Sequence, residues 1–344
     1  DLREDSSATQ ASFTVGHQVG DIARQVYDPK GKGALIDFKV GGFEAAFERT
    51  QALLQANQPI FEAGFRAEGA LAFADVMLPI KQAGNRAWRM VEVKSSTSVK
   101  DYHRDDAAVQ AFLAHSCGVP LAGIALAHID SSWVYPGGGD YSGLLVENDL
   151  TDEAFPREAE VRGWIEEAHG IVAKKKEPRV LTGEQCSAPY ECGFFAYCQS
   201  NEPLVEQPLH WLPGAQNKAL KAHIEAHGLS ELRDVPDGLL NEKQRRVKKV
   251  TLTGKVHFDQ VSAARDLAQH KLPAYFMDFE TIQFAVPIWK GTRPYQQIPF
   301  QFSVHRLART GKLEQQAFLD LSSGDPSRAF AEALVGACGE RGPI

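Results

Sequence analysis

The chain has 344 residues, which by length alone suggests about two domains of roughly 150 residues each. With 43% hydrophobic and 24% charged residues it has the composition of a globular protein, and its net charge of −7 excludes a global positive field but not a local basic groove for nucleic acid. No apolar run of membrane-spanning length and no signal peptide occurs, so we expect a cytoplasmic protein with no membrane partner.

The first elements are expected to be two helices with a strand between them. Apolar residues recur at helical spacing over residues 9–27, a segment that contains His17, and again over 43–56. A short strand is expected over 35–40. These elements lead into the part of the chain that carries the chemistry.

Two apolar runs, over 71–77 and 88–94, predict an antiparallel hairpin around a turn at 83–85. A symmetric register places Asp75 directly opposite Glu92 because their midpoint falls in that turn. Directly opposite side chains lie roughly 5 Å apart, and two negative charges at that distance repel by about 3 kcal/mol at an effective dielectric near 20. We therefore expect a positive partner between them.

A hard divalent cation such as Mg²⁺, bound through one or two carboxylates and several waters, suits this pair. Lys94 follows Glu92 by two residues and is expected on the same face, where it would orient a water or stabilise charge on a phosphate. The alternative interpretation is a surface hairpin with scattered charges. Asp and Glu are poor strand residues, and their place within apolar runs favours the metal site.

The elements after the hairpin complete a sheet with helices on its faces. A helix is predicted over 101–116, with Gln110 beside its apolar stripe, and a buried strand over 121–129. A further helix over 153–173 runs into the lysines 174–176, which we interpret as a solvated helix end. The fold class expected is α/β, with a mixed sheet flanked by helices.

Three cysteines with intervening aromatic residues, Cys186, Cys192 and Cys198, follow at C-x5-C-x5-C spacing. This spacing is wider than that of the usual zinc knuckle, so ligation of an iron–sulfur cluster is the other common explanation. A cluster normally has four ligands, and we interpret Cys117 and Cys338 as small core residues. The fourth ligand is then either absent or lies before the start of this sequence.

The segment 203–272 differs in character and is expected to be a small helical connector. Its short helices are predicted over 220–227, 229–235 and 239–250. Its basic residues are Lys243, Arg245, Arg246, Lys248 and Lys249. They form either a solvated helix face or a contact surface for nucleic-acid phosphates.

The last segment opens with an apolar strand over 274–281 that carries Asp278 and Glu280 on one face, a second candidate metal-binding strand. Strands over 300–307 and 315–321 and a helix over 327–337 are expected to follow.

We accordingly divide the chain into residues 1–202, 203–272 and 273–344. The absence of an initial Met, and an end where a new strand is expected to begin, lead us to expect a fragment of a longer protein.

A resemblance to known proteins rests on Asp75, Glu92-Val93-Lys94 and Gln110, preceded by His17 in a helix. This series resembles the PD-(D/E)XK nucleases of the RecB type, including the CRISPR-associated RecB-like exonucleases, which commonly carry a cysteine cluster late in the domain. Over residues 9–321 the chain also resembles a bacterial family in which such a module precedes a DnaQ-like, RNase H-fold exonuclease domain. That domain's first motif matches Asp278 and Glu280. The resemblance implies a restriction-endonuclease-like mixed sheet, a connector and the start of an RNase H-like domain.

The resemblance also assigns roles to residues. It implies that His17, Asp75, Glu92 and the carbonyl of Val93 ligate Mg²⁺ or Mn²⁺, with Lys94 catalytic and Gln110 positioning. It implies that Cys186, Cys192 and Cys198 are three ligands of a [4Fe-4S] cluster whose fourth ligand would precede Asp1. The acids that complete a DnaQ-like site would lie beyond Ile344.

The expected function is a metal-dependent nuclease that hydrolyses phosphodiester bonds, with DNA favoured over RNA as the partner and a structural iron–sulfur cluster. The alternative is a nucleic-acid-binding module that does not cleave, with zinc or nothing at the cysteines. A third option places the main activity in the downstream exonuclease domain. The sequence identifies no protein partner.

Overall fold

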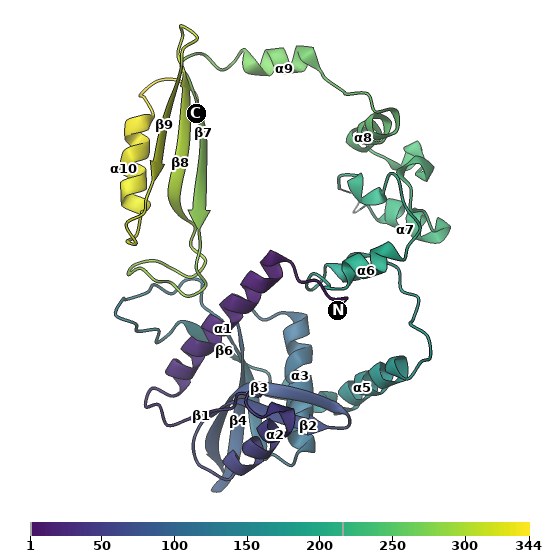
Figure 1. The fold of residues 1–344 in the computed structure, drawn as a ribbon, viewed down its shortest axis with the longest axis vertical. Coiled ribbons are helices and arrows are strands. Elements are labelled where there is room, and N and C mark those ends of the chain that lie inside the picture. The colour runs from purple at the N-terminus through teal and green to yellow at the C-terminus, as the bar shows by residue number, and fades with distance from the viewer. Residues whose placement is uncertain (1, 215–216) are drawn as a thin grey trace. The chain divides into compact units, whose positions relative to one another are not determined.

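The computed structural model describes residues 2–214 and 217–344. The protein is a mixed α/β structure with a six-stranded mixed sheet, ordered β1-β2-β3-β4-β5-β6, and a three-stranded antiparallel sheet, ordered β7-β8-β9. Figure 1 shows the order of the elements along the chain. The expected α/β class is confirmed.

The elements up to the cysteine segment build the larger sheet and its helices. They are α1 (Ser7–Tyr27), β1 (Ala34–Leu35), α2 (Gly42–Leu53), β2 (Ile60–Ala67), β3 (Ala70–Gln82), β4 (Asn85–Lys94), α3 (Asp101–Ser116), β5 (Leu121–Ile129), β6 (Leu145–Asp149), α4 (Thr151–Ala154), η1 (Phe155–Arg157) and α5 (Glu158–Val172).

The later elements are short helices followed by the smaller sheet. They are η2 (Glu184–Cys186), α6 (Phe195–Ser200), η3 (Leu209–Trp211), α7 (Lys218–His227), η4 (Leu232–Asp234), η5 (Asp237–Leu239), α8 (Glu242–Thr253), α9 (Gln260–Leu267), β7 (Ala274–Ile282), β8 (Ile298–Leu307), β9 (Leu313–Leu319) and α10 (Ser327–Ala337).

By its contacts the chain forms two compact units. The first comprises residues 1–195, 278–303 and 317–336, and the second comprises 196–277, 304–316 and 337–344. The expected domain boundaries at residues 202 and 272 describe parts that fold independently, and these boundaries stay a prediction.

Helices α1 and α3 cover opposite faces of the larger sheet. Trp88 and Met90 of β4 pack in one core with α3, whereas Val91 and Val93 belong to a second cluster on the side of α1. Because successive residues of a strand point to opposite faces, this alternation separates the two helices. Residues at even positions of β4 therefore face α3, which places Glu92 and Lys94 on that side.

Several expected elements differ in the structure. The strand expected over 35–40 is reduced to β1 because residues 38–41 form a turn, with Gly41 at φ 88°. The connector helix expected over 229–235 is only the 3-10 turn η4, since Pro236 and the extended residue Val235 end it. The short strand β6 and helix α9 were missed because β6 has only two apolar residues and α9 is only eight residues long, with Val261 and Leu267 as its large apolar residues.

Among the described residues, no helix combines the length and the apolar character needed to cross a bilayer.

Candidate functional site

The hairpin formed by β3 and β4 has the register expected from the sequence. Gln82 pairs with Asn85, and the two turn residues Ala83 and Gly84 have φ values of 48° and 83°, as tight hairpin turns require. The pairs then advance one residue on each strand to Val76 opposite Val91. The expected register is therefore confirmed as far as this pair. One residue further along, it places Asp75 opposite Glu92, and the charge of Asp75 acts on Glu92.

The two carboxylates are held by different contacts. Asp75 accepts a hydrogen bond of 2.6 Å from the backbone N–H of Val93 to its Oδ2. Glu92 is only 4% exposed and receives a hydrogen bond of 2.8 Å from Lys94 Nζ to its Oε1. A backbone donor and a lysine therefore fix the acids from β4 itself.

Lys94 bridges the sheet and helix α3. Its Nζ donates to Asp106 Oδ2 at 2.6 Å as well as to Glu92, and its side chain is 25% exposed. Asp106 was not recognised from the sequence. It lies four residues before Gln110, so the two share one face of α3, and that spacing was the available signal.

Gln110, which the sequence placed beside the apolar stripe of its helix, is buried and lies beside Glu92. Its Nε2 donates to the carbonyl of Phe73 at 3.1 Å and to Glu92 Oε2 at 3.4 Å. Its Oε1 is buried and has no hydrogen-bond partner within the described part of the chain. Gln110 thus holds Glu92 and leaves one acceptor for a further donor.

Burial makes these acids hard to ionise. It raises the pKa of Asp75, although the Val93 N–H and the charge of Lys94 oppose the shift. Burial and then the negative charge of Asp75 raise the pKa of Glu92 well above its usual value. Burial disfavours the charge on Lys94, but Glu92 and Asp106 outweigh that effect and raise its pKa. The single positive charge of Lys94 cannot neutralise Asp75, Glu92 and Asp106 if all three are ionised.

A further acid, Glu62 of β2, was missed by the sequence reasoning. Phe61 pairs with Val76 and Ala63 with Ala74, so Glu62 and Asp75 lie between the same two ladder pairs of β2 and β3. Glu62, Asp75 and Glu92 therefore occupy one level of three adjacent strands. The sequence pattern that could have identified Glu62 is the one that identified Asp75, namely an acid within an apolar strand.

His17 forms no metal-binding group with these acids among the described residues. His17 is exposed on α1, while the buried residues of that helix are Val19, Ile22 and Ala23. Across residues 2–214 and 217–344, no three His, Cys, Asp or Glu side chains converge where they would hold a metal ion. Two carboxylates, a backbone carbonyl and waters still form a suitable set for Mg²⁺.

The cysteine segment lies partly in each unit. Cys186 and Cys192 belong to the first unit, where Cys192 N donates to the carbonyl of Cys186 at 2.8 Å. Cys198 lies in α6, within the second unit. Among the described residues none of the three is in a disulfide bond, and all three are partly exposed. Cys117 and Cys338, expected in the core, are also only partly buried.

The second-site acids are exposed. Asp278 and Glu280 lie in β7, one of the two edge strands of the smaller sheet in the described structure. Their positions two residues apart agree with the expected strand, and no partner acid approaches them to form a metal-binding group among the described residues.

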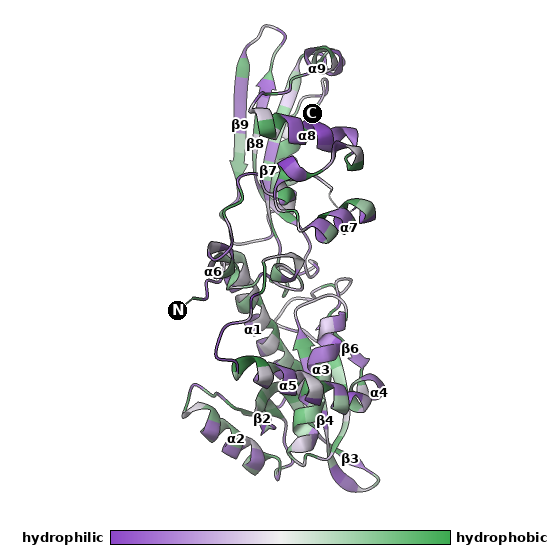
Figure 2. Cartoon of the chain, turned by 90° about the vertical axis from the view of Figure 1, so that its right-hand side faces the viewer, coloured by the Kyte–Doolittle hydropathy of each residue, from purple (hydrophilic) through white to green (hydrophobic). Residues whose placement is uncertain are grey.

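The basic residues of the connector lie on α8, which Figure 2 shows as mainly hydrophilic. Three of them make local contacts: Arg245 donates to the carbonyl of Leu240, Arg246 to Glu242, and Lys248 to Asp237. The others, Lys243 and Lys249, are exposed.

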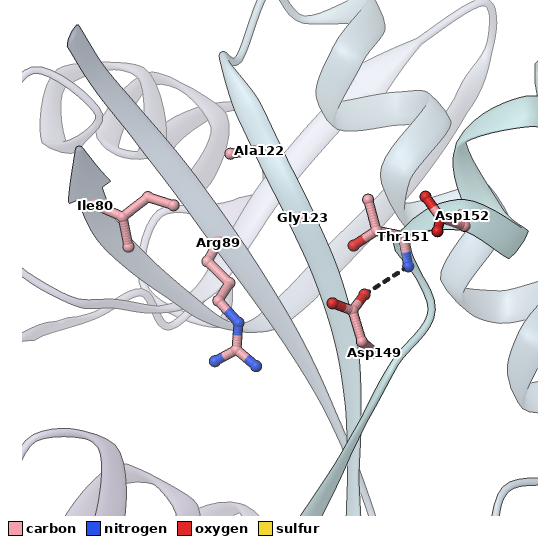
Figure 3. A pocket seen from close by; sticks show the side chains of 7 residues that line it. All are labelled: Ile80, Arg89, Ala122, Gly123, Asp149, Thr151 and Asp152. Atoms are coloured by element: carbon pink, nitrogen blue, oxygen red, sulfur yellow. Dashed lines mark hydrogen bonds between the residues drawn. The ribbon is translucent and has the colours of Figure 1, made fainter. Parts of the chain in front are cut away.

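A pocket of about 270 Å³ opens nearer the turn of the hairpin (Figure 3). It is lined by Ile80, Arg89, Ala122, Gly123, Asp149, Thr151 and Asp152. Its polar groups have partners: Asp149 accepts from the N–H of Thr151 at 2.9 Å, and Arg89 donates to Glu147. None of the residues expected to be functional lines this pocket.

Comparison with protein families matches residues 275–344 to the family described as Domain of unknown function (DUF2779). The match covers the smaller sheet from Tyr275 onward and α10, and it identifies no nuclease family. A comparison with curated proteins gave no match.

Proposed function

We propose that this chain is a metal-dependent nuclease that hydrolyses phosphodiester bonds of nucleic acid, with DNA favoured as substrate. The supporting observation is the position of Asp75 opposite Glu92, with Lys94 hydrogen-bonded to Glu92. Two buried carboxylates with raised pKa values resist ionising together. A divalent cation is the natural partner because it stabilises both charges.

In this proposal Asp75, Glu92 and the carbonyl of Val93 hold Mg²⁺ or Mn²⁺, and His17 stays a proposed further ligand. The cation supplies Lewis acidity and lowers the pKa of a bound water. Lys94 donates to the charge that develops on the phosphate, and Asp106 keeps Lys94 in position. Gln110 orients Glu92 through its side-chain amide.

We propose that Cys186, Cys192 and Cys198 ligate a structural [4Fe-4S] cluster. Supporting this, Glu4 N donates to the carbonyl of Gly193 at 2.8 Å, and Ser6 Oγ donates to Glu191 at 2.7 Å. The residues before α1 thus lie against the cysteine loop, where a cluster would fasten the two segments together. Protein purified without oxygen should show a broad absorption near about 400 nm, as thiolate-bound iron does; a colourless zinc protein would overturn this part.

A second candidate function is nucleic-acid binding without cleavage. It is favoured by the lack of three converging metal ligands among the residues described and by the pairing of Lys94 with two acids. In that case the main activity would belong to the domain that begins with β7, through Asp278 and Glu280. The basic residues of α8 would contact phosphates in either case.

A cleavage assay separates these functions. Labelled single- and double-stranded DNA and RNA are incubated with the protein, with and without Mn²⁺. Asp75→Asn and Glu92→Gln should abolish cleavage, whereas Asp149→Asn, which changes an acid on β6, should not. Full activity in Asp75→Asn would overturn the proposal, and loss only in Asp278→Asn would assign cleavage to the second domain. Circular dichroism confirms that each variant is folded.

A further inference from the structure

The loop between Cys186 and Cys192 presents an aromatic residue beside the candidate site. The hydrogen bond from Cys192 N to the Cys186 carbonyl closes this loop. Tyr190 lies within it and is 64% exposed. Its ring meets the ring of Tyr102 edge to face, with 5.2 Å between the ring centroids and 70° between the planes.

Tyr102 belongs to the same helix face as the residues that hold the site. Tyr102, Asp106 and Gln110 follow one another at intervals of four residues in α3, which places them on one stripe of the helix. Asp106 binds Lys94 and Gln110 binds Glu92. The cysteine loop therefore contacts the first turn of the helix that lines the candidate site.

Electrostatic effects agree with this placement. Burial and then a hydrogen bond to Tyr102 raise the pKa of Tyr190 to about 12, and the charges of Lys94 and Asp106 also influence it. Lys100, which directly precedes α3, is exposed. Lys100 therefore offers a positive charge for a phosphate two residues from Tyr102, whereas Lys94 is already paired with Glu92 and Asp106.

We propose that Tyr102 and Tyr190 form a stacking surface for a base of single-stranded nucleic acid, next to the Glu92–Lys94 site. This inference rests on the proposed function and specifies its substrate class. An edge-to-face pair leaves a ring face of the exposed tyrosine open, and every base stacks on such a face. Bases in a duplex are already stacked on one another, so the pair selects unpaired strands.

The exposure of Tyr190 favours binding over a purely structural role. A ring that only fastened the loop to α3 would gain most by being buried. Instead, Tyr190 keeps most of its surface in solvent while Tyr102 and the closed loop hold its position. Such a rigid, exposed aromatic residue loses little conformational freedom when it binds a base.

The test measures binding separately from cleavage. Fluorescence anisotropy with a labelled single-stranded oligonucleotide and its duplex, in EDTA, gives the affinities of the full chain. Tyr190→Ala and Tyr190→Leu should weaken single-strand binding about tenfold or more, and Tyr190→Trp should keep it. Duplex binding should not change. Phe258→Ala removes an exposed aromatic residue elsewhere and should have no effect.

Unchanged single-strand affinity in Tyr190→Ala, recovery in Tyr190→Leu, or an equal loss for duplex would overturn the proposal. Thermal unfolding identifies any variant that fails to fold. Comparing Tyr190→Leu with Tyr190→Trp separates the loss of the aromatic ring from the loss of side-chain volume, because both replacements are large. If the protein cleaves but Tyr190→Ala binds normally, this inference fails while the nuclease proposal stands. If the protein binds single strands through Tyr190 without cleaving them, the nuclease proposal fails alone.

Discussion

Glu62 lies level with Asp75, between the ladder pairs Phe61–Val76 and Ala63–Ala74 of β2 and β3, with its backbone in the left-handed region at φ 58°. This conformation costs a non-glycine residue of order 1–3 kcal/mol and persists only where surrounding contacts enforce it. Burial and then the charge of Asp75 raise the pKa of Glu62 to about 7. The proximity of Glu62 and Asp75 therefore makes it unfavourable for both acids to be ionised at once.

Glu62→Gln should stabilise the protein above neutral pH. The folded state binds the Glu62 proton more tightly than the unfolded chain does. The stability that protonated Glu62 provides is therefore fully present below a pH of about 4.5, and it is lost as the pH rises to about 7. The gain at pH 8 is at most about 3 kcal/mol, and less because the side chain is partly solvated. Denaturant unfolding at pH 5 and pH 8 measures it. Glu167→Gln on α5 controls for loss of charge; an equal gain there would contradict the explanation.

Mn²⁺ should raise the melting temperature through Asp75 and Glu92. A ligand at 100 times its dissociation constant stabilises the folded state by about 2.7 kcal/mol, and Glu92→Gln removes one of the two carboxylates. Calorimetry with and without Mn²⁺ should show a rise for the unchanged protein and for Asp149→Asn, but none for Glu92→Gln. A rise of the same size in Glu92→Gln would place the cation elsewhere.

Lys94→Met should impair both cleavage and folding. It removes the positive partner of Glu92 and Asp106, which should lower kcat by about 100-fold or more and destabilise the fold by roughly 3 kcal/mol. The loss of stability should be larger at pH 8 than at pH 5, because protonation relieves the unpaired acids. Unfolding curves at both pH values measure it. Lys81→Met, at the exposed end of β3, should change neither quantity; equal effects would rule out this explanation.

Thr50→Val should loosen α2 from β2. Thr50 is fully buried, donates to the carbonyl of Ala46 at 2.9 Å and accepts from the N–H of Gly64 at 2.9 Å. Valine has the same shape but leaves the Gly64 N–H buried without a partner, which costs about 1–3 kcal/mol. Urea unfolding measures the loss. Thr14→Val, at an exposed position of α1, should stay within about 0.5 kcal/mol of the unchanged protein.

Local patterns were sufficient for the hairpin and for most helices. Alternating apolar residues, together with a two-residue turn, allow one register that buries Trp88 and Met90 on the side of α3, and that register fixes Asp75 opposite Glu92. Gln110 was expected beside the apolar stripe of its helix, and in the structure it is among the buried residues of α3. These features depend on neighbours within one or two elements.

Other contacts join residues from distant parts of the sequence, and local sequence patterns did not predict them. Asp106 reaches Lys94 only because α3 crosses the sheet above β4. Tyr190 reaches Tyr102 across 88 positions of the chain, a contact that no short-range spacing encodes. The exposure of His17 could not be predicted either. The sequence of a helix shows which of its faces is apolar, but it does not show which element packs against the other face.

By itself, the sequence determined the α/β class, the hairpin register and the pairing of two acids with a nearby lysine, since alternation and helical spacing are properties of the chain's own geometry. Only the tertiary structure decided that Glu62 completes the acidic level, that Asp106 shares Lys94, and that the cysteine loop meets α3. These relations depend on which strands become neighbours and where a helix crosses them, and that is set by burial of the whole core at once.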